Sequence, residues 1–353
     1  MKTALVTGVN GQNGSYLAEL LLEKGYKVVG TVRRASTNNT ERIDHIKDNN
    51  FSVVECDITD SGNVFDIIAK TRPQEIYNTC GQSHVHTSFE QPNYTFQVNA
   101  CGVLNLLEGI RFFAPSCRMI SFNTSEMFGD SYSVEQNTDT PYDEPRKYQD
   151  ENTRFAPRSP YAVSKMAAHN LIHTYRDSYN LFVCSSINFN NESMRRGENF
   201  VTRKITKYIG RLVNHKTSDK LKLGNIYAKR DWGHTKDTVR GTWLALQHRV
   251  PDDYVFCTGE THSVEEFLNE AFNLVNLDWH DYVEIDKNLF RPAEVDYLCG
   301  RADKAKRVLK WEPTVSFKKL VKEMVESDIF KYRNTGGLIP KTNNYIPAQL
   351  SRV

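Results

Sequence analysis

The sequence lacks three features that would place it in other classes of protein: a surplus of charge of one sign, a long apolar run, and paired cysteines. Its 353 residues carry 45 Lys plus Arg and 43 Asp plus Glu, a formal net charge of +2. This balance gives no electrostatic footprint for nucleic acid or for a membrane surface. No apolar run approaches the roughly 18 residues of a membrane-spanning helix, so we expect no such helix.

The seven cysteines are scattered along the chain, and none lies two residues from another. This argues against a disulfide framework or a zinc site and favours a reducing compartment. Met1 leads directly into a strand-like stretch, without the apolar core of a signal peptide. We therefore expect a soluble, cytoplasmic protein. With 39% hydrophobic residues, it can bury a substantial core.

The first half of the chain alternates strand-like and helix-like stretches. The expected strands cover residues 2–7, 27–32, 51–55, 75–79, 117–123 and 181–187, and a helix is expected over 15–24, ended by Gly25. Repeated alternation predicts an α/β fold with a doubly wound, mostly parallel sheet. Beyond residue 188 the alternation is lost, and helices are expected over 200–213, 264–275 and 317–329.

These patterns predict two domains. The first covers residues 1–187, and we expect it to recruit about 226–258 as well. The second is a smaller, mixed α/β domain over 188–353, whose tail from 334 is loosely held or lies at an interface.

A glycine-rich loop follows the first strand and opens the first helix. It reads Gly8-Val9-Asn10-Gly11-Gln12-Asn13-Gly14. Missing side chains let the backbone approach a pyrophosphate, which the helix N-terminus then holds. The strand before and the helix after favour a Rossmann-type dinucleotide site over a glycine-rich turn without a ligand.

The second strand ends at Arg33 and Arg34, with Ser36 close by. An NAD site usually has an acidic residue there, whereas guanidinium groups match a phosphate. We therefore predict NADP, with Arg33 on the 2′-phosphate; a solvated surface pair is the alternative. Further cofactor contacts are expected after the third and fourth strands, from Asp57, Ile58, Cys80, Gln82 and Ser83.

The candidate chemical centre combines a strand end with a helix start. Tyr161 and Lys165 are four residues apart on a helix that Ser159 should cap, so they share a face. A nearby Lys charge and an oxidised nicotinamide would favour the phenolate and lower the pKa of Tyr161. After the fifth strand, Thr124 and Glu126 should point the same way on an extended chain. Hydride transfer alone does not need the carboxyl of Glu126, but removal of a carbon-bound proton does.

Together these motifs make the chain resemble the extended short-chain dehydrogenases/reductases and, more narrowly, the GDP-mannose 4,6-dehydratase family. The resemblance spans residues 3 to about 330. It is carried by TGVNGQNGSYLAELLLEKGY, VRRAS, Thr124-Ser125-Glu126 with MFG, PRSPYAVSK, RRGENFVTRKI, LGNIYAKRDWGH, TGETHSVEEF and FRPAEVDYLCG.

The resemblance implies a catalytic set and a reaction. Tyr161, with Thr124 and Lys165, would deprotonate the mannose 4-hydroxyl while a hydride passes from C4 to NADP. Glu126 would then remove the C5 proton and protonate the leaving 6-hydroxyl, and the hydride would return to C6 and a proton to C5. The product would be GDP-4-keto-6-deoxymannose, a precursor in GDP-fucose biosynthesis.

The resemblance also implies the ligand contacts. Asn191 and Arg196 would contact the cofactor, as would Tyr161 and Lys165 themselves. The substrate would be bound by Ser83, Asn190, Val201, Lys204, Arg230, Arg291 and Glu294. Solvated surface charge is the alternative for the cations, and packing is expected for Asp231 and Trp232.

Three departures from the family pattern stand out. Asn191 replaces a histidine that the family places near the cofactor, and Tyr227 stands where an acid is usual. The polar segment 130–157 is longer than expected and should form a surface excursion, which could cap the site or extend a subunit contact.

Other readings of the sequence stay open. A nucleotide-sugar epimerase or reductase could use the same scaffold, reduction of the keto product by NADPH could be a side activity, and an NADP-sensing regulator is the non-enzyme alternative. No metal site is expected: His84 and His86 lack further ligands, and His234 should be packed. The resemblance also implies that the loop over 33–42 touches a neighbouring subunit, in a homodimer or homotetramer.

Overall fold

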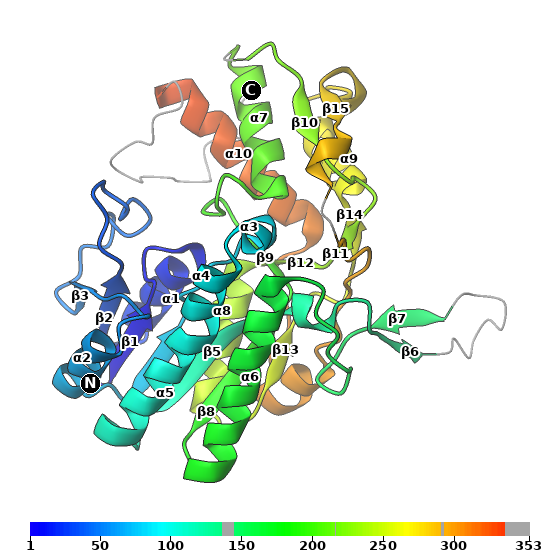
Figure 1. Cartoon of the computed structure of the whole chain (residues 1–353). Coiled ribbons are helices and arrows are strands. Elements are labelled where there is room, and N and C mark those ends of the chain that lie inside the picture. The colour runs from blue at the N-terminus through cyan, green and yellow to red at the C-terminus, as the bar shows by residue number, and fades with distance from the viewer. Residues whose placement is uncertain (136–144, 216, 291–292, 336–353) are drawn as a thin grey trace.

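A parallel sheet of seven strands forms the centre of the computed structural model, which describes residues 1–135, 145–215, 217–290 and 293–335 (Figure 1). Its strand order is β13-β8-β5-β4-β1-β2-β3, so the order reverses between β1 and β4. The strands are β1 (Thr3–Thr7), β2 (Lys27–Val32), β3 (Phe51–Glu55), β4 (Glu75–Asn78), β5 (Arg118–Thr124), β8 (Val183–Asn188) and β13 (Tyr254–Phe256). The predicted doubly wound fold is confirmed, and ligands of such folds bind beyond the carboxyl ends of the strands at this reversal.

Helices cover both faces of the sheet. On one face α1 (Gln12–Glu23) packs beside α8 (Thr235–Gln247), and both contribute to one buried apolar cluster. The other face is covered by α2 (Ser61–Thr71), α5 (Gly102–Phe113) and α6 (Pro160–Tyr179). Between β4 and α5 the chain forms α3 (Val85–Glu90), α4 (Pro92–Phe96) and a π-helical turn (Gln97–Cys101).

Local sequence signals fix two helix ends that matter for the site. The hydroxyl of Ser159 accepts a hydrogen bond from the N–H of Ala162 at 3.1 Å, and Pro160 occupies the first turn of α6. Gly25 has a φ of +76° directly after α1, a conformation that glycine adopts at no steric cost. Both predicted signals are confirmed.

A smaller unit of mixed structure lies on the side of the sheet where β8 ends (Figure 1). Its helices are α7 (Val201–Val213), α9 (Val264–Asn273) and α10 (Phe317–Thr335), which enclose a separate apolar cluster around Trp232. α10 continues past residue 334, where a tail was predicted to begin, and residues 336–353 lie outside the described part. The short strands of this unit pair as β9 (Asn190–Glu192) with β12 (Trp232–His234), β10 (Leu221–Leu223) with β15 (Val283–Ile285), and β11 (Lys229–Arg230) with β14 (His262–Ser263).

The long segment after β5 leaves the sheet and returns to the point where it began. β6 (Ser133–Glu135) and β7 (Arg146–Tyr148) form an antiparallel pair that projects away from the sheet, whereas residues 136–144 are outside the described part (Figure 1). At its base the N–H of Ala156 donates to the carbonyl of Met127 at 2.9 Å. A Cβ on Gly129, whose φ is +55°, would lie 1.8 Å from the Ala156 oxygen, so this close return requires glycine.

Single-turn helices complete the described structure: Ser125–Phe128, Trp279–Asp281, Lys287–Leu289 and a π-helical turn at Ala305–Leu309. None of the helices in the described ranges has the length and apolar character needed to cross a bilayer.

Candidate active site

The glycine-rich loop forms a cradle in which backbone meets backbone. A Cβ on Gly14 would lie 2.4 Å from the carbonyl oxygen of Gly8 and 2.7 Å from the Cα of Val9, so this position accepts no larger residue. Gly11 is the N-cap of α1 and brings no capping side chain. Beside it, the Oδ1 of Asn13 is buried and lacks a hydrogen-bond partner among the described residues. The loop therefore has the space, at a helix N-terminus, that a phosphate-bearing ligand needs, and the Oδ1 of Asn13 is an acceptor, unused by the described residues, for a donor group of such a ligand.

Two polar side chains of this loop bind other parts of the chain. Gln12 donates from Nε2 to the carbonyl of Asn191 at 2.9 Å, and its Oε1 accepts from the hydroxyl of Ser193 at 2.7 Å. Asn10 donates from Nδ2 to the carbonyl of Asn39 at 3.0 Å. The loop is thus tied to β9 and to the exposed turn after β2, while cofactor contacts of Asn10 and Gln12 stay a prediction.

A cavity of about 410 Å³ opens where β2 and β3 end. Arg33, Arg34 and Asp57 line it, and the Nη1 of Arg33 donates to the hydroxyl of Tyr94 at 2.6 Å. The Asp57 carboxylate accepts from the N–H and the hydroxyl of Thr59, which orders this turn. The predicted residue Ser36 is exposed on the neighbouring turn.

The predicted contacts after β4 lie at the strand reversal, whereas those after β3 follow the edge strand of the sheet. Cys80 packs against Gly8, and burial raises the pKa of its thiol to about 11. Gln82 is fixed by its N–H, which donates to the Oδ1 of Asn99 at 2.9 Å. Ile58 is buried, whereas Ser83 is exposed.

The predicted catalytic side chains meet between β5 and α6. Tyr161 is 8% exposed, and its hydroxyl forms a hydrogen bond with the side chain of Thr124. Glu126 is close enough that its charge acts on the pKa of Tyr161. An extended chain was expected after β5, but the chain turns at Ser125 instead. The hydroxyl of Thr124 accepts a hydrogen bond from the N–H of Glu126 at 3.2 Å in this turn. The three side chains are nevertheless brought together.

The pKa of Tyr161 is raised in the protein itself, whereas Lys165 and a bound oxidised nicotinamide were expected to lower it. Burial raises it to about 12, which outweighs the hydrogen bond with Thr124. Lys165 is also buried, its pKa falls to about 8, and its Nζ donates to the carbonyl of Phe122 at 2.6 Å. In the protein itself, desolvation thus dominates both groups. The predicted lowering of the Tyr161 pKa depends on the oxidised nicotinamide as well as on Lys165, so it stays a prediction for the enzyme with cofactor bound.

The predicted substrate residues lie on several elements of the smaller unit. Arg230 is 7% exposed, and its Nη2 donates to the Oε1 of Glu294 at 2.9 Å, so these two residues bind each other. Val201 begins α7 and Lys204 is exposed on it, while Asn190 pairs with Trp232 across β9 and β12. Arg291 lies outside the described residues, and Tyr227 is exposed.

Comparison with known proteins agrees with this arrangement. The family model for GDP-mannose 4,6 dehydratase matches residues 5–324. The chain belongs to this family. It is 50% identical over 340 residues to GDP-mannose 4,6 dehydratase 2 of Arabidopsis thaliana, covering 93% of this chain and 87% of that protein. The identity to GDP-mannose 4,6 dehydratase of Homo sapiens is 41% over 352 residues, covering 92% and 91%.

Among solved structures, DesIV, a dTDP-glucose 4,6-dehydratase from Streptomyces venezuelae determined with NAD and TYD bound, superimposes with a TM-score of 0.80. The match covers 96% of this chain and 100% of that chain at 22% sequence identity, so it supports the fold alone.

Sequence reasoning placed Arg196 near the cofactor but missed the carboxylate beside it. Glu192 is 1% exposed, and its Oε2 lies 3.3 Å from the Nε of Arg196. The guanidinium of Arg196 stacks 3.7 Å over the ring of Phe200, and its charge lowers the pKa of Tyr161. The four-residue spacing of Glu192 and Arg196 was a signal, but nothing in the sequence shows that the carboxylate is buried.

Asn191, where this family member departs from the pattern, is also held in place. It is 8% exposed, and its Oδ1 accepts a hydrogen bond from the hydroxyl of Thr238 at 2.8 Å. Asp231 has the packing role that was expected: its carboxylate accepts hydrogen bonds from the N–H groups of Thr258, Gly259 and Gly300 and from the hydroxyl of Thr258. Trp232 is buried, as expected.

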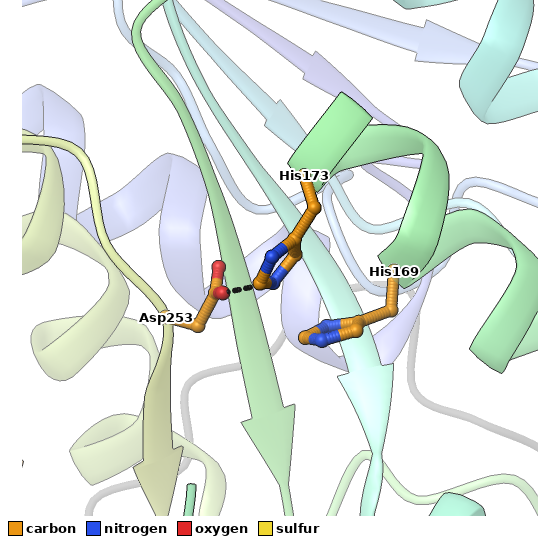
Figure 2. Close-up of side chains that lie close together, drawn as sticks. All are labelled: His169, His173 and Asp253. Carbon is orange, nitrogen blue, oxygen red and sulfur yellow. Dashed lines mark ion pairs between the residues drawn. The ribbon is translucent and has the colours of Figure 1, made fainter. Parts of the chain in front are cut away.

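Among the described residues, one group has the spacing of a metal site: His169, His173 and Asp253 (Figure 2). The Oδ2 of Asp253 faces His173 at 2.5 Å, while Oδ1 accepts from the guanidinium of Arg176 and from the N–H of Ser185. Because Arg176 already neutralises the carboxylate and would repel a cation, we interpret the group as an ion-pair network that ties α6 to the chain before β13.

The histidines considered from sequence have structural contacts. The Nδ1 of His84 accepts from the N–H of Thr87 at the start of α3, and His86 pairs with Glu90 at 3.5 Å. His234 is 1% exposed and packed, as predicted.

Proposed function

We propose that this chain is a hydro-lyase that converts GDP-mannose to GDP-4-keto-6-deoxymannose and water, with NADP as its internal hydride carrier. Membership in the GDP-mannose 4,6-dehydratase family supports the reaction. The single observation that supports the mechanism best is the grouping of Tyr161, Thr124 and Glu126, because a dehydratase needs a carboxyl group beside a hydroxyl-deprotonating pair.

The glycine cradle fits the pyrophosphate of a dinucleotide. Gly8, Gly11 and Gly14 leave room for it, and backbone N–H groups at the start of α1 would donate to its oxygens. The buried Oδ1 of Asn13 would accept from a hydroxyl of the ligand rather than from its phosphates. When bound, NADP would supply a hydride acceptor whose positively charged ring also favours the Tyr161 phenolate. NADP is preferred over NAD because guanidinium groups, rather than a carboxylate, follow β2.

The protein's own groups would handle the protons. Tyr161 would accept the proton of the sugar 4-hydroxyl, and Thr124 would hold that hydroxyl in place. Lys165 lies one turn along α6 and would orient the ligands through its ammonium group. A ketone at C4 acidifies the C5 hydrogen, which Glu126 would take and pass to the departing 6-hydroxyl. The C5=C6 double bond left by this elimination would take the hydride back at C6 and a proton at C5, so one water is lost and no net oxidation occurs.

The nucleotide end would be bound by the smaller unit. Lys204 is an exposed cation on α7 that suits a diphosphate, with Val201 and Asn190 beside the sugar. Arg230 and Glu294 form an ion pair and would contact the nucleotide together. The predicted contacts of Ser83 and Arg291 belong to the same proposal.

Incubation with GDP-mannose alone tests the reaction, because a 4-keto sugar develops absorbance in alkali. Glu126→Gln should abolish water loss while leaving NADPH binding intact, and the matched control Glu284→Gln, an exposed strand carboxylate, should keep full turnover. Full turnover by Glu126→Gln would refute its role. An epimerised or reduced sugar as the product would favour the alternative enzymes.

Cofactor choice is tested separately. Arg33→Ala should reduce the preference for NADP over NAD in a binding titration, because the cavity at the end of β2 loses one of two cations. Arg307→Ala, an exposed residue outside that cavity, is the control. An unchanged preference in Arg33→Ala would contradict the assignment.

We also propose that the protein works as a cytoplasmic homodimer or homotetramer in GDP-fucose biosynthesis. Residues 33–38 are all exposed on the turn beside the cofactor cavity, which suits a subunit contact. Light scattering measures the mass in solution, and a monomer would contradict this proposal.

A further inference from the structure

Glu192 is a buried carboxylate to which the proposed reaction assigns no step. It ends β9, is 1% exposed, and its backbone carbonyl accepts from the hydroxyl of Thr235 at 3.1 Å. Its Oε2 accepts a hydrogen bond from the hydroxyl of Thr202 at 2.7 Å and lies 3.3 Å from the Nε of Arg196. Burial raises its pKa, and Arg196 and Thr202 offset this in part. A carboxylate that stays charged while buried needs a nearby group of opposite charge.

That group is Arg196, which is held from two sides. Phe200 stacks against the guanidinium plane at 3.7 Å, and Glu192 faces its Nε. The Nε is buried and forms no regular hydrogen bond among the described residues, so the carboxylate is the charged group that orients it. Phe200 in turn packs edge-on against His84 at 5.7 Å, which links this cluster to the loop after β4.

We propose that Glu192 is a positioning residue that fixes the Arg196 guanidinium beside Tyr161 and the cofactor. This rests on the proposed function, in which Arg196 contacts NADP and Tyr161 accepts a proton. The proposal gives Glu192 no contact with the reacting atoms: its Oε2 binds Thr202 and faces Arg196.

The consequence for the chemistry is electrostatic. Tyr161 is faced by Glu126, whose charge raises its pKa, and by Arg196, whose charge lowers it. Thr124 hydrogen-bonds to it, and Lys165 lies one turn further along α6 with its Nζ on the Phe122 carbonyl. If Arg196 moves away, the balance shifts toward Glu126, the phenol deprotonates less readily, and activity should rise only at higher pH.

A double-mutant cycle between Glu192→Gln and Arg196→Met tests the proposal with two readouts, NADPH affinity by fluorescence titration and the pH profile of turnover. Each single variant should weaken NADPH binding on the order of tenfold, a typical coupling between residues in contact. Each should also move the acid limb of activity to higher pH. The double variant should be no worse than Arg196→Met, because Glu192 acts through Arg196.

Controls separate positioning from general stability. Glu198→Gln removes a carboxylate from the same loop that pairs with Lys207 and Lys331, so both readouts should stay unchanged. Glu192→Asp keeps the charge and should restore part of the affinity; if Glu192→Gln does not fold, the cycle is run with this variant.

Single effects that multiply in the double variant would overturn the proposal, since Glu192 would then act independently of Arg196. The two proposals can fail separately. If the variants change NADPH affinity as expected but the wild-type protein does not convert GDP-mannose, the proposed function is refuted and the positioning role of Glu192 is retained.

Discussion

Replacement of Asp328 by asparagine should destabilise the protein strongly, because this carboxylate is the buried counter-charge of Arg203 across the contact of α10 with α7. The two side chains are 0% and 6% exposed. Two parallel hydrogen bonds join them, from Nε to Oδ2 at 2.8 Å and from Nη2 to Oδ1 at 2.7 Å. The hydroxyl of Thr206 adds a third bond to Oδ2 at 2.7 Å.

The size of the effect follows from what is left behind. Asparagine offers one neutral oxygen, so a guanidinium charge would remain buried without a counter-ion, which typically costs about 3–5 kcal/mol. The helices cannot easily separate to admit water: a Cβ on Gly210 would already lie 2.7 Å from the backbone of Asp328. For 353 residues unfolding as one unit, this loss corresponds to a fall in Tm of about 4–7 °C.

Thermal unfolding of Asp328→Asn is the direct assay. The matched control is Glu326→Gln on the same helix, whose partner Lys322 lies 3.7 Å away at the surface, and its Tm should change by less than about 1 °C. Arg203 also donates to the carbonyls of Met194 and Arg196, so NADPH affinity should fall in Asp328→Asn as well. A Tm within about 1 °C of the wild type would refute the reasoning.

Three further predictions concern a glycine, a histidine and an aspartate. Gly14→Ala should abolish NADPH binding in a titration, because its Cβ would meet the Gly8 carbonyl at 2.4 Å, whereas Gly25→Ala, with nothing within 4 Å, should keep the affinity. Burial lowers the pKa of His169 to about 4, so the unfolded chain binds the extra proton and stability should fall by about 3 kcal/mol between pH 6.5 and 4; urea titrations of His169→Asn should show this slope reduced. Asp231→Asn should cost about 1–3 kcal/mol in urea unfolding, because an amide nitrogen would face hydrogen-bond donors.

The sequence predicted the elements whose signals are local. Strand and helix alternation gave the sheet, Ser159 and Gly25 gave helix ends, and the β2, β3 and β4 bounds agree within a residue. The grouping of Thr124 with Tyr161 was also predictable, since a strand end and the next helix start meet at one edge of a parallel sheet.

Contacts made over long chain distances could not be predicted in this way. Nothing local indicates that Gln12 binds the segment after Asn190, or that Arg203 meets a carboxylate 125 positions later. The raised pKa of Tyr161 in the protein itself could not be predicted for the same reason: it depends on burial, which many separate segments create together.

The return of the chain to the central sheet limits how this protein can be divided. β13 pairs with β8 and α8 packs on α1, although both follow the first strands and helix of the smaller unit. A fragment ending at residue 188 would expose a wholly buried strand as an unprotected edge and remove one wall of an apolar cluster. Chimaeras between relatives should therefore exchange residues 235–256 together with the amino-terminal half, because a single crossover point would combine surfaces that were never matched to each other.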